Sequence, residues 1–142
     1  MFKSMLSNGL VMIGLMFHAS IQCYGQCVTP HICRGKDPMG VSIISLIASP
    51  KRFDKCFVRV VGVINVGFEG DALYLHEEDY QSGLTKNSLR LYLSDAQREI
   101  FKKSSGSHVI LEGIFYGTGP DANEMTSGAI SKITRLDFWG NH

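Results

Sequence analysis

Two widely separated stretches of the chain carry the same hydrophobic pattern around a central glycine. They read VRVVGVI at 58–64 and VILEGIF at 109–115. Runs rich in β-branched and aliphatic residues predict strands, and a glycine inside a strand marks a bend or a barrel corner. We therefore predict two long bent strands, the first over 56–68, with Gly62 and Gly113 at their bends.

Strict alternation of apolar and polar residues marks two shorter strands between the long ones. The segments ALYLH at 72–76 and SLRLYL at 88–93 place leucines on one face and polar or aromatic side chains on the other. A turn at 69–71 joins the first of them to the preceding long strand. The last strand, at about 129–136, does not keep the two-residue period, so we expect a bulge there.

Two segments have helical spacing instead. Residues 41–48 carry apolar side chains three and four positions apart, with a serine that can cap the helix and Pro50 to end it. The motif SDAQ at 94–97 has the form of a capping box and predicts a second helix that closes near Gly106. The residues of this helix expected to face inward are Ala96, Ile100 and Phe101.

The expected elements follow one another as helix, three strands, helix and two strands. The strands and the second helix have the order of the OB-fold, a five-stranded, partly open barrel. The sequence therefore predicts a mainly β protein with a single OB-fold-like domain over 40–142. In this domain a short helix precedes the five strands of the barrel. Such a fold does not by itself define a function.

Several blocks spread over this domain carry a more specific pattern. They are VSII at 41–44, ASPKRF at 48–53, VRVVG at 58–62, FEGDALYLHEEDY at 68–80, GLTKN at 83–87 and ITRL at 133–136. In these blocks the chain resembles a family of small, largely uncharacterised exported bacterial proteins, for which no reaction is assigned. The resemblance implies export and the OB-fold-like domain. Cys56 departs from the family pattern, in which a basic or polar residue is common at that position.

The N-terminus has the form of a signal peptide. Lys3 is followed by the apolar run LVMIGLMF at 10–17 and then by small residues. This run is far shorter than the roughly 20 residues that span a bilayer. We predict a signal peptide over 1–25, an N-terminal segment over 26–39, and a periplasmic or extracellular protein without a stable membrane span.

The exact processing site is less well defined than the signal itself. Cleavage after Gly25 fits the small-residue rule, and cleavage nearer Ala19 or Ser20 is an alternative. A lipoprotein acylated at Cys23 is less favoured, because Gln22 stands where a small residue is expected.

Charge argues against nucleic acid as a partner. The chain has 14 lysines and arginines against 13 acidic residues. Loss of 1–25 removes only Lys3, so the mature chain is neutral. Proteins that bind nucleic acid usually carry a basic stripe, and the densest basic cluster here is Lys51, Arg52 and Lys55.

The cysteines leave two alternatives open. Cys27 and Cys33 are close enough to close a small disulfide loop in an oxidising compartment, or they pair variably in a loose segment that also has Cys56 as a possible partner. Together with His31 they resemble half of a metal site, but a second ligand pair at zinc spacing is missing. We predict no metal and no cofactor.

Catalytic groupings are sparse. The densest titratable run is HEED at 76–79, but consecutive residues on a strand point to opposite faces. This run is better interpreted as a solvated strand end, and Ser104, Ser105, Ser107 and His108 lie between a helix end and a strand start. We predict no catalytic residues, and a protein that is not an enzyme.

One surface remains as a candidate binding site. If the leucines of the two short strands face inward, then Tyr74, His76, Arg90 and Tyr92 face outward and lie together on adjacent strands. Such a surface suits an oligosaccharide, a peptide or another envelope protein. The alternative is a structural or interaction domain in which a loop covers this face, and exposure of Tyr74 and Tyr92 distinguishes the two.

Overall fold

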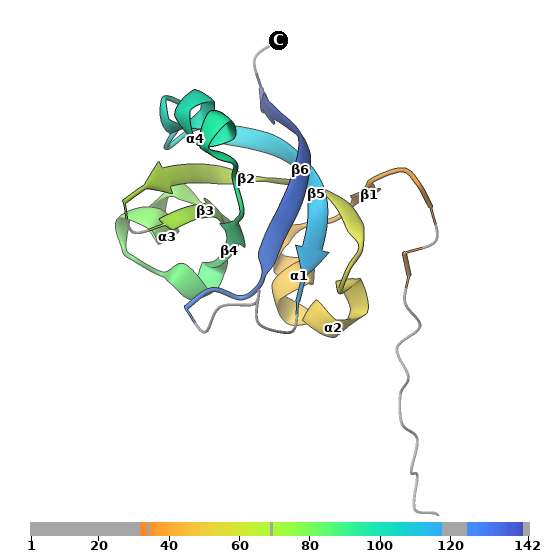
Figure 1. Cartoon of the computed structure of the whole chain (residues 1–142). Helices are drawn as coiled ribbons and strands as arrows, with labels where there is room; N and C mark the ends of the chain where they lie inside the picture. The colour runs from red at the N-terminus through yellow and green to blue at the C-terminus, as the bar shows by residue number, and fades with distance from the viewer. Residues whose placement is uncertain (1–31, 34, 69, 118–124, 141–142) are drawn as a thin grey trace, which may run out of the picture.

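The computed structural model describes residues 32–33, 35–68, 70–117 and 125–140. The predicted signal peptide, 1–25, lies outside the described residues, as does Cys27, so the prediction of export stays a prediction. Within the described part of the chain the protein is mainly β, with one sheet and a few short helices (Figure 1).

The helices and strands follow the predicted order with four additions. They are β1 (Met39–Gly40), α1 (Ile43–Ala48), α2 (Pro50–Phe53), β2 (Phe57–Gly67), β3 (Gly70–Tyr74), α3 (Glu77–Gln81), the 3₁₀ turn η1 (Thr85–Asn87), β4 (Ser88–Leu91), α4 (Asp95–Lys102), β5 (His108–Tyr116) and β6 (Ala129–Phe138). The prediction of five strands was wrong for the described residues, because the short β1 pairs with β2 and makes the sheet six-stranded.

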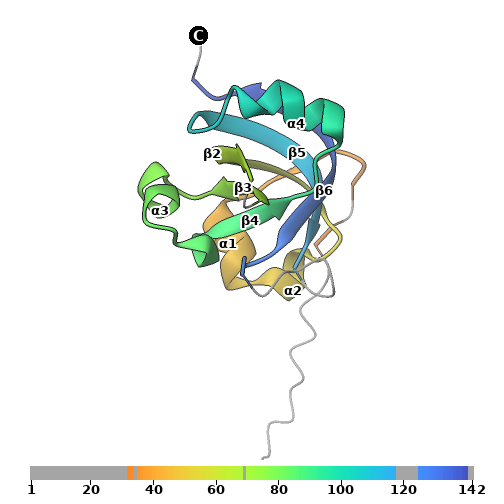
Figure 2. The ribbon, with the colours of Figure 1, turned by 60° about the vertical axis from the view of Figure 1, so that its left-hand side comes forward.

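The sheet closes on itself. Its strand order is β1-β2-β3-β4-β6-β5, and a further pairing joins β2 to β5 and completes a ring. The pairs β1–β2 and β4–β6 are parallel, and the others are antiparallel. Figures 1 and 2 both show α4 at one end of this ring and α1 with α2 at the opposite end.

Strand β2 belongs to both sides of the ring, which requires it to bend. Residues 57–63 pair with β5, and residues 63–67 pair with β3. Gly62 lies where the partner changes. A Cβ atom there would be 2.6 Å from the carbonyl oxygen of Tyr74 and 2.7 Å from Cδ1 of Ile43. Only a glycine lets the strands and α1 approach so closely.

The bulge expected in the last strand is confirmed. The β5–β6 register changes from Glu112 opposite Arg135 to Ile114 opposite Ser131, so β6 has extra residues at this point. Lys132, inside the bulge, has a left-handed φ of 48°. Gly113 lies opposite the bulge, and a Cβ atom there would be 2.6 Å from Cγ2 of Ile130.

A disulfide joins the segment before β1 to the start of β2, and this corrects one sequence expectation. Cys33 pairs with Cys56, with Cα atoms 5.2 Å apart, and not with Cys27. The topology explains the choice, because β1 pairs Met39 with Val58 and so carries the preceding segment past Cys56. Cys56 is fully buried and belongs to the hydrophobic core.

The helices agree with the sequence in their starts but not in all their faces. Ser42 caps α1, and Ser94 with Gln97 forms the predicted capping box of α4. Pro50 does not only end the first helix but begins α2. In α4 the predicted inward residues Ala96 and Ile100 are exposed.

The predicted inward face of α4 is confirmed at Phe101 and wrong at Ala96 and Ile100. Gln97 donates through Nε2 to the carbonyl of Ile133 at 3.1 Å, and Phe101 packs against the core. These two residues are four apart and therefore share a helix face. None of the helices in the described ranges is long and apolar enough to cross a membrane.

Candidate functional site

The outer face of β3 and β4 is built by the alternation that the sequence shows. Leu73 and Leu91 point into the core, while Tyr74 and Arg90 point outward on neighbouring strands. The register places Ala72 opposite Arg90. The predicted inside and outside of these two strands are therefore correct.

Tyr74 is nevertheless buried. Its side chain is 7% exposed and forms a small second cluster with Val63 and Ala72 outside the ring. Tyr80 of α3 covers it, with ring centroids 5.5 Å apart and planes at 60°. Of the two alternatives for this face, the one with an exposed Tyr74 does not hold, because the chain after β3 folds back as a helix over that strand.

Arg90 is the cation of this face. Its guanidinium lies over the ring of Tyr92, 5.7 Å from the centroid, and Tyr92 itself is 41% exposed. Gly70 leaves room beside it, since a Cβ atom there would be 3.8 Å from Nη1 of Arg90. Among the described residues, no carboxylate lies within ion-pair distance of Arg90.

Other arginines of the protein do have carboxylate partners. Nε of Arg59 lies 2.7 Å from Oε1 of Glu112, and Nη1 of Arg135 lies 3.4 Å from the same oxygen. A hydrogen bond to Asp137, more than the contact with Glu112, raises the pKa of Arg135. Within the described part of the chain Arg90 has no such partner, a property that it shares with the exposed Arg52. Arg90 differs from Arg52 because it lines a groove with aromatic and polar side chains.

These side chains border a groove of about 210 Å³. Its walls come from the outer sheet face, from the α3–η1 region and from the segment before β6. The lining residues are Asn65, Gly70, Asp71, Ala72, Tyr74, Tyr80, Gly83, Thr85, Arg90, Met125 and Thr126. We call this site the β3–β4 groove.

The two other predicted site residues lie outside the groove. His76 stands at the N-cap position of α3 without a side-chain capping hydrogen bond and is exposed, since β3 ends at Tyr74 and not at His76. Tyr92 contributes only through its contact with Arg90. Of the four residues predicted to form a site, the structure therefore brings Tyr74 and Arg90 into the groove lining.

The run HEED at 76–79 has a structural role in place of a solvated strand end. Three acids occupy the first turn of α3, a position that the helix dipole favours. Asp79 is buried and accepts a hydrogen bond from Nδ2 of Asn87 at 2.8 Å, which ties α3 to η1. This acidic first turn is the sequence signal that would have predicted α3 and hence Tyr80.

Nothing in the described ranges groups three or more metal-binding side chains. Of the half-site suggested by Cys27, His31 and Cys33, the first two lie outside the described residues. Cys33 is bonded to Cys56 and is not available as a thiolate ligand.

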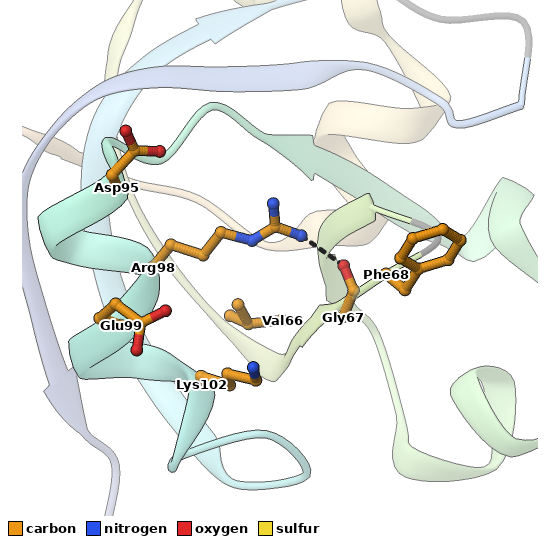
Figure 3. Close-up of a pocket in the computed structure, with 7 residues that line it drawn as sticks. All are labelled: Val66, Gly67, Phe68, Asp95, Arg98, Glu99 and Lys102. Atoms are coloured by element: carbon orange, nitrogen blue, oxygen red, sulfur yellow. Dashed lines mark hydrogen bonds between the residues drawn. The ribbon is translucent and has the colours of Figure 1, made fainter.

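A second groove, of about 430 Å³, lies between α4 and the β2–β3 hairpin (Figure 3). Arg98 crosses it from α4, donates to the carbonyl of Gly67 and lies 3.2 Å from Oδ1 of Asp71. Asp95, Glu99 and Lys102 also line it, so its charges balance. The groove is bridged by Arg98, which holds the hairpin to the helix.

A third groove, of about 530 Å³, is mostly aliphatic. It lies beside the exposed ring of Trp139 and includes Val41, Val61 and Ile110. Arg59, the one charged residue among the described residues that line this groove, is already bonded to Glu112. This groove has apolar surface but few groups that could orient a ligand.

No protein-family model matches this chain, and a comparison with curated proteins found no match. The fold is similar to part of the crystal structure of a proposed aspartyl-tRNA synthetase from Leishmania major Friedlin, with 9% sequence identity and a TM-score of 0.41. The match covers 74% of this chain and 21% of that chain. Values this low do not indicate a shared function.

Proposed function

We propose that the protein is an exported ligand-binding module with an OB-fold-like barrel, and that its binding site is the β3–β4 groove. The pairing of strands β2 to β6 in a ring, with α4 between β4 and β5, supports the OB-fold assignment. OB-folds bind ligands over their second and third strands, which correspond to β3 and β4 here.

The observation that carries the proposal is the meeting of an unpaired guanidinium with an aromatic wall. Among the described residues Arg90 has no carboxylate partner, and it borders the same groove as Tyr80, which is 40% exposed. Concave sites with a few convergent polar groups are typical of ligand binding. An oligosaccharide, a peptide or another envelope protein are the partners we consider.

Export is supported by two features of the chain. The N-terminus has the basic start and short apolar run of a signal peptide. The pairing of Cys33 with Cys56 fits an oxidising compartment such as the periplasm or the extracellular space. The nearly equal numbers of basic and acidic residues speak against nucleic acid as the ligand.

The proposal is tested by titrating the ¹⁵N-labelled protein with a panel of oligosaccharides and short peptides and following the amide shifts. A ligand of the groove should move the signals of Asn65, Arg90 and Thr126. The variant Tyr80→Ala should weaken that response, whereas Ile100→Ala, an exposed residue of α4, should not. Binding that moves only signals remote from the groove would reject this site.

A structural or interaction domain without a small ligand is the second candidate function. It is favoured by the cover that Tyr80 gives to Tyr74, because part of the predicted surface is packed under α3. In that case no member of the panel changes the spectrum, and Tyr80→Ala lowers the melting temperature without altering any binding.

A further inference from the structure

We infer that the β3–β4 groove takes an acidic saccharide, with a sugar carboxylate bound by Arg90 and the sugar ring held near Tyr80. This inference rests on the proposed function, in which the groove is the binding site. It adds the class of ligand and the group that selects it.

The first step concerns the charge of Arg90. A half-buried guanidinium without an acidic partner in the described part of the chain leaves its donors available to an anion. Arginine binds carboxylates in a planar, two-point geometry. The ring of Tyr92 lies against the guanidinium and limits its orientations, so less freedom is lost when the anion binds.

The acid within the groove does not cancel this cation. Asp71 is the one carboxylate that lines the β3–β4 groove among the described residues. It lies 3.2 Å from the guanidinium of Arg98, which comes from α4. Since Arg98 balances Asp71, the charge of Arg90 remains for a ligand.

The second step concerns the remaining walls. Asn65 and Thr85 supply an amide and a hydroxyl group, which are able to donate to and accept from sugar hydroxyls. The hydroxyl of Thr126 donates to the carbonyl of Gly128 at 3.1 Å and is able to accept from a sugar hydroxyl. Tyr80 adds an aromatic side chain that is 40% exposed. At about 210 Å³ the groove is smaller than usual ligand pockets, which begin at about 300 Å³, so it suits a single ring-sized group.

The sheet disfavours an extended peptide at this position. Strand β3 is hydrogen-bonded to β2 on one side and to β4 on the other. Strand β4 is hydrogen-bonded to β3 on one side and to β6 on the other. A peptide that binds by adding a strand needs a free edge. A nucleic acid would need several cations along a path, and Arg90 is the only one that lines the groove among the described residues.

The experiment compares a carboxylated sugar with its neutral ester. Hexagalacturonate, its full methyl ester and hexathymidylate are each titrated into the purified protein by calorimetry. We expect the acid to bind at least about tenfold more tightly than the ester, because a charge-assisted hydrogen bond is stronger than one between neutral groups. The variant Arg90→Gln should remove this difference.

The matched control is Arg52→Gln. Arg52 is an exposed arginine that also lies 5.7 Å from an aromatic ring, that of Phe53, but it is outside the groove. This variant should keep the preference for the acid. The Nε–Hε signal of Arg90 in the parent protein gives a second measurement, which does not depend on folding of the variant, and it should shift with the acid alone.

The outcomes separate this inference from the proposed function. Equal binding of acid and ester, with shifts in the groove, overturns the acidic preference and leaves the groove as the site. Tighter binding of hexathymidylate, or no binding of either saccharide, overturns the saccharide class. If, in addition, no oligosaccharide or peptide of the panel shifts the amide signals of the groove residues, the proposed function itself is rejected.

Discussion

Single residues decide how closely the strands of this ring can approach. At Gly62 an added Cβ would meet a backbone carbonyl as well as side chains, and a carbonyl in a paired strand cannot move aside easily. We expect Gly62→Val to lower the free energy of unfolding by about 1–3 kcal/mol through overpacking. Urea unfolding of parent and variant measures this.

Gly40 provides the control for Gly62. Nothing lies within 4 Å of a Cβ atom built at Gly40, which belongs to β1, the strand paired with the first part of β2. Gly40→Ala should therefore leave the unfolding midpoint nearly unchanged. Equal midpoints for Gly62→Val and the parent would contradict the close packing at the bend.

The two predicted tyrosines of the outer face should respond differently to truncation. Tyr74 is 7% exposed and packs on Tyr80, so Tyr74→Ala should cost about 3–5 kcal/mol of stability. Tyr92 is 41% exposed, so Tyr92→Ala should cost no more than about 1 kcal/mol, including its contact with Arg90. Thermal melts of the two variants measure the contrast, and similar losses would contradict the cover by α3.

At the scale of helices and strands, local sequence patterns predicted the buried faces of strands and the start of a helix. The alternation in β3 and β4 fixes which side chains enter the core, and the SDAQ motif fixes where α4 begins. In α4 the prediction was right for Phe101 and wrong for Ala96, because Gln97, a polar residue, takes an inward place by bonding to the carbonyl of Ile133.

Elements that depend on distant partners were not predictable in this way. Strand β1 has two residues and no periodicity, and it exists because it pairs with β2. The groove likewise combines Tyr80 with Met125 and Thr126, which are far apart in the sequence and come together only when the ring closes. The alternation could therefore predict Arg90 and Tyr74, but not the walls around them.

The disulfide connects two elements and should contribute to stability. Cys33 and Cys56 are 23 residues apart in the sequence, and the bond holds the segment before β1 against the start of β2. Closing a loop of this size stabilises by about 3 kcal/mol in the chain-entropy model. We expect dithiothreitol to lower the melting temperature of the parent.

The variant Cys33→Ser supplies the control for this reduction. It should melt near the temperature of the reduced parent and should be insensitive to dithiothreitol. Serine is placed at position 33 because Cys33 is only half-buried, whereas Cys56 is fully buried and a hydroxyl there would add its own cost. A melting temperature of the parent that does not change on reduction would contradict the stabilising role of the bond.

For the whole molecule, removal of the signal peptide and formation of the disulfide should leave a mature chain with one disulfide and one thiol. The chain has four cysteines, and removal of 1–25 takes away Cys23. With Cys33 bonded to Cys56, Cys27 would then have no partner cysteine within the same chain. We expect the exported protein to begin at Gln26. A thiol-alkylating reagent applied under denaturing, non-reducing conditions should modify it once, at Cys27. Intact and peptide mass spectrometry measure both the N-terminus and the modification. Cleavage nearer Ser20 would retain Cys23, and the mature chain would then have an even number of cysteines. Recovery of the full-length chain from the membrane fraction would contradict the prediction of a signal peptide.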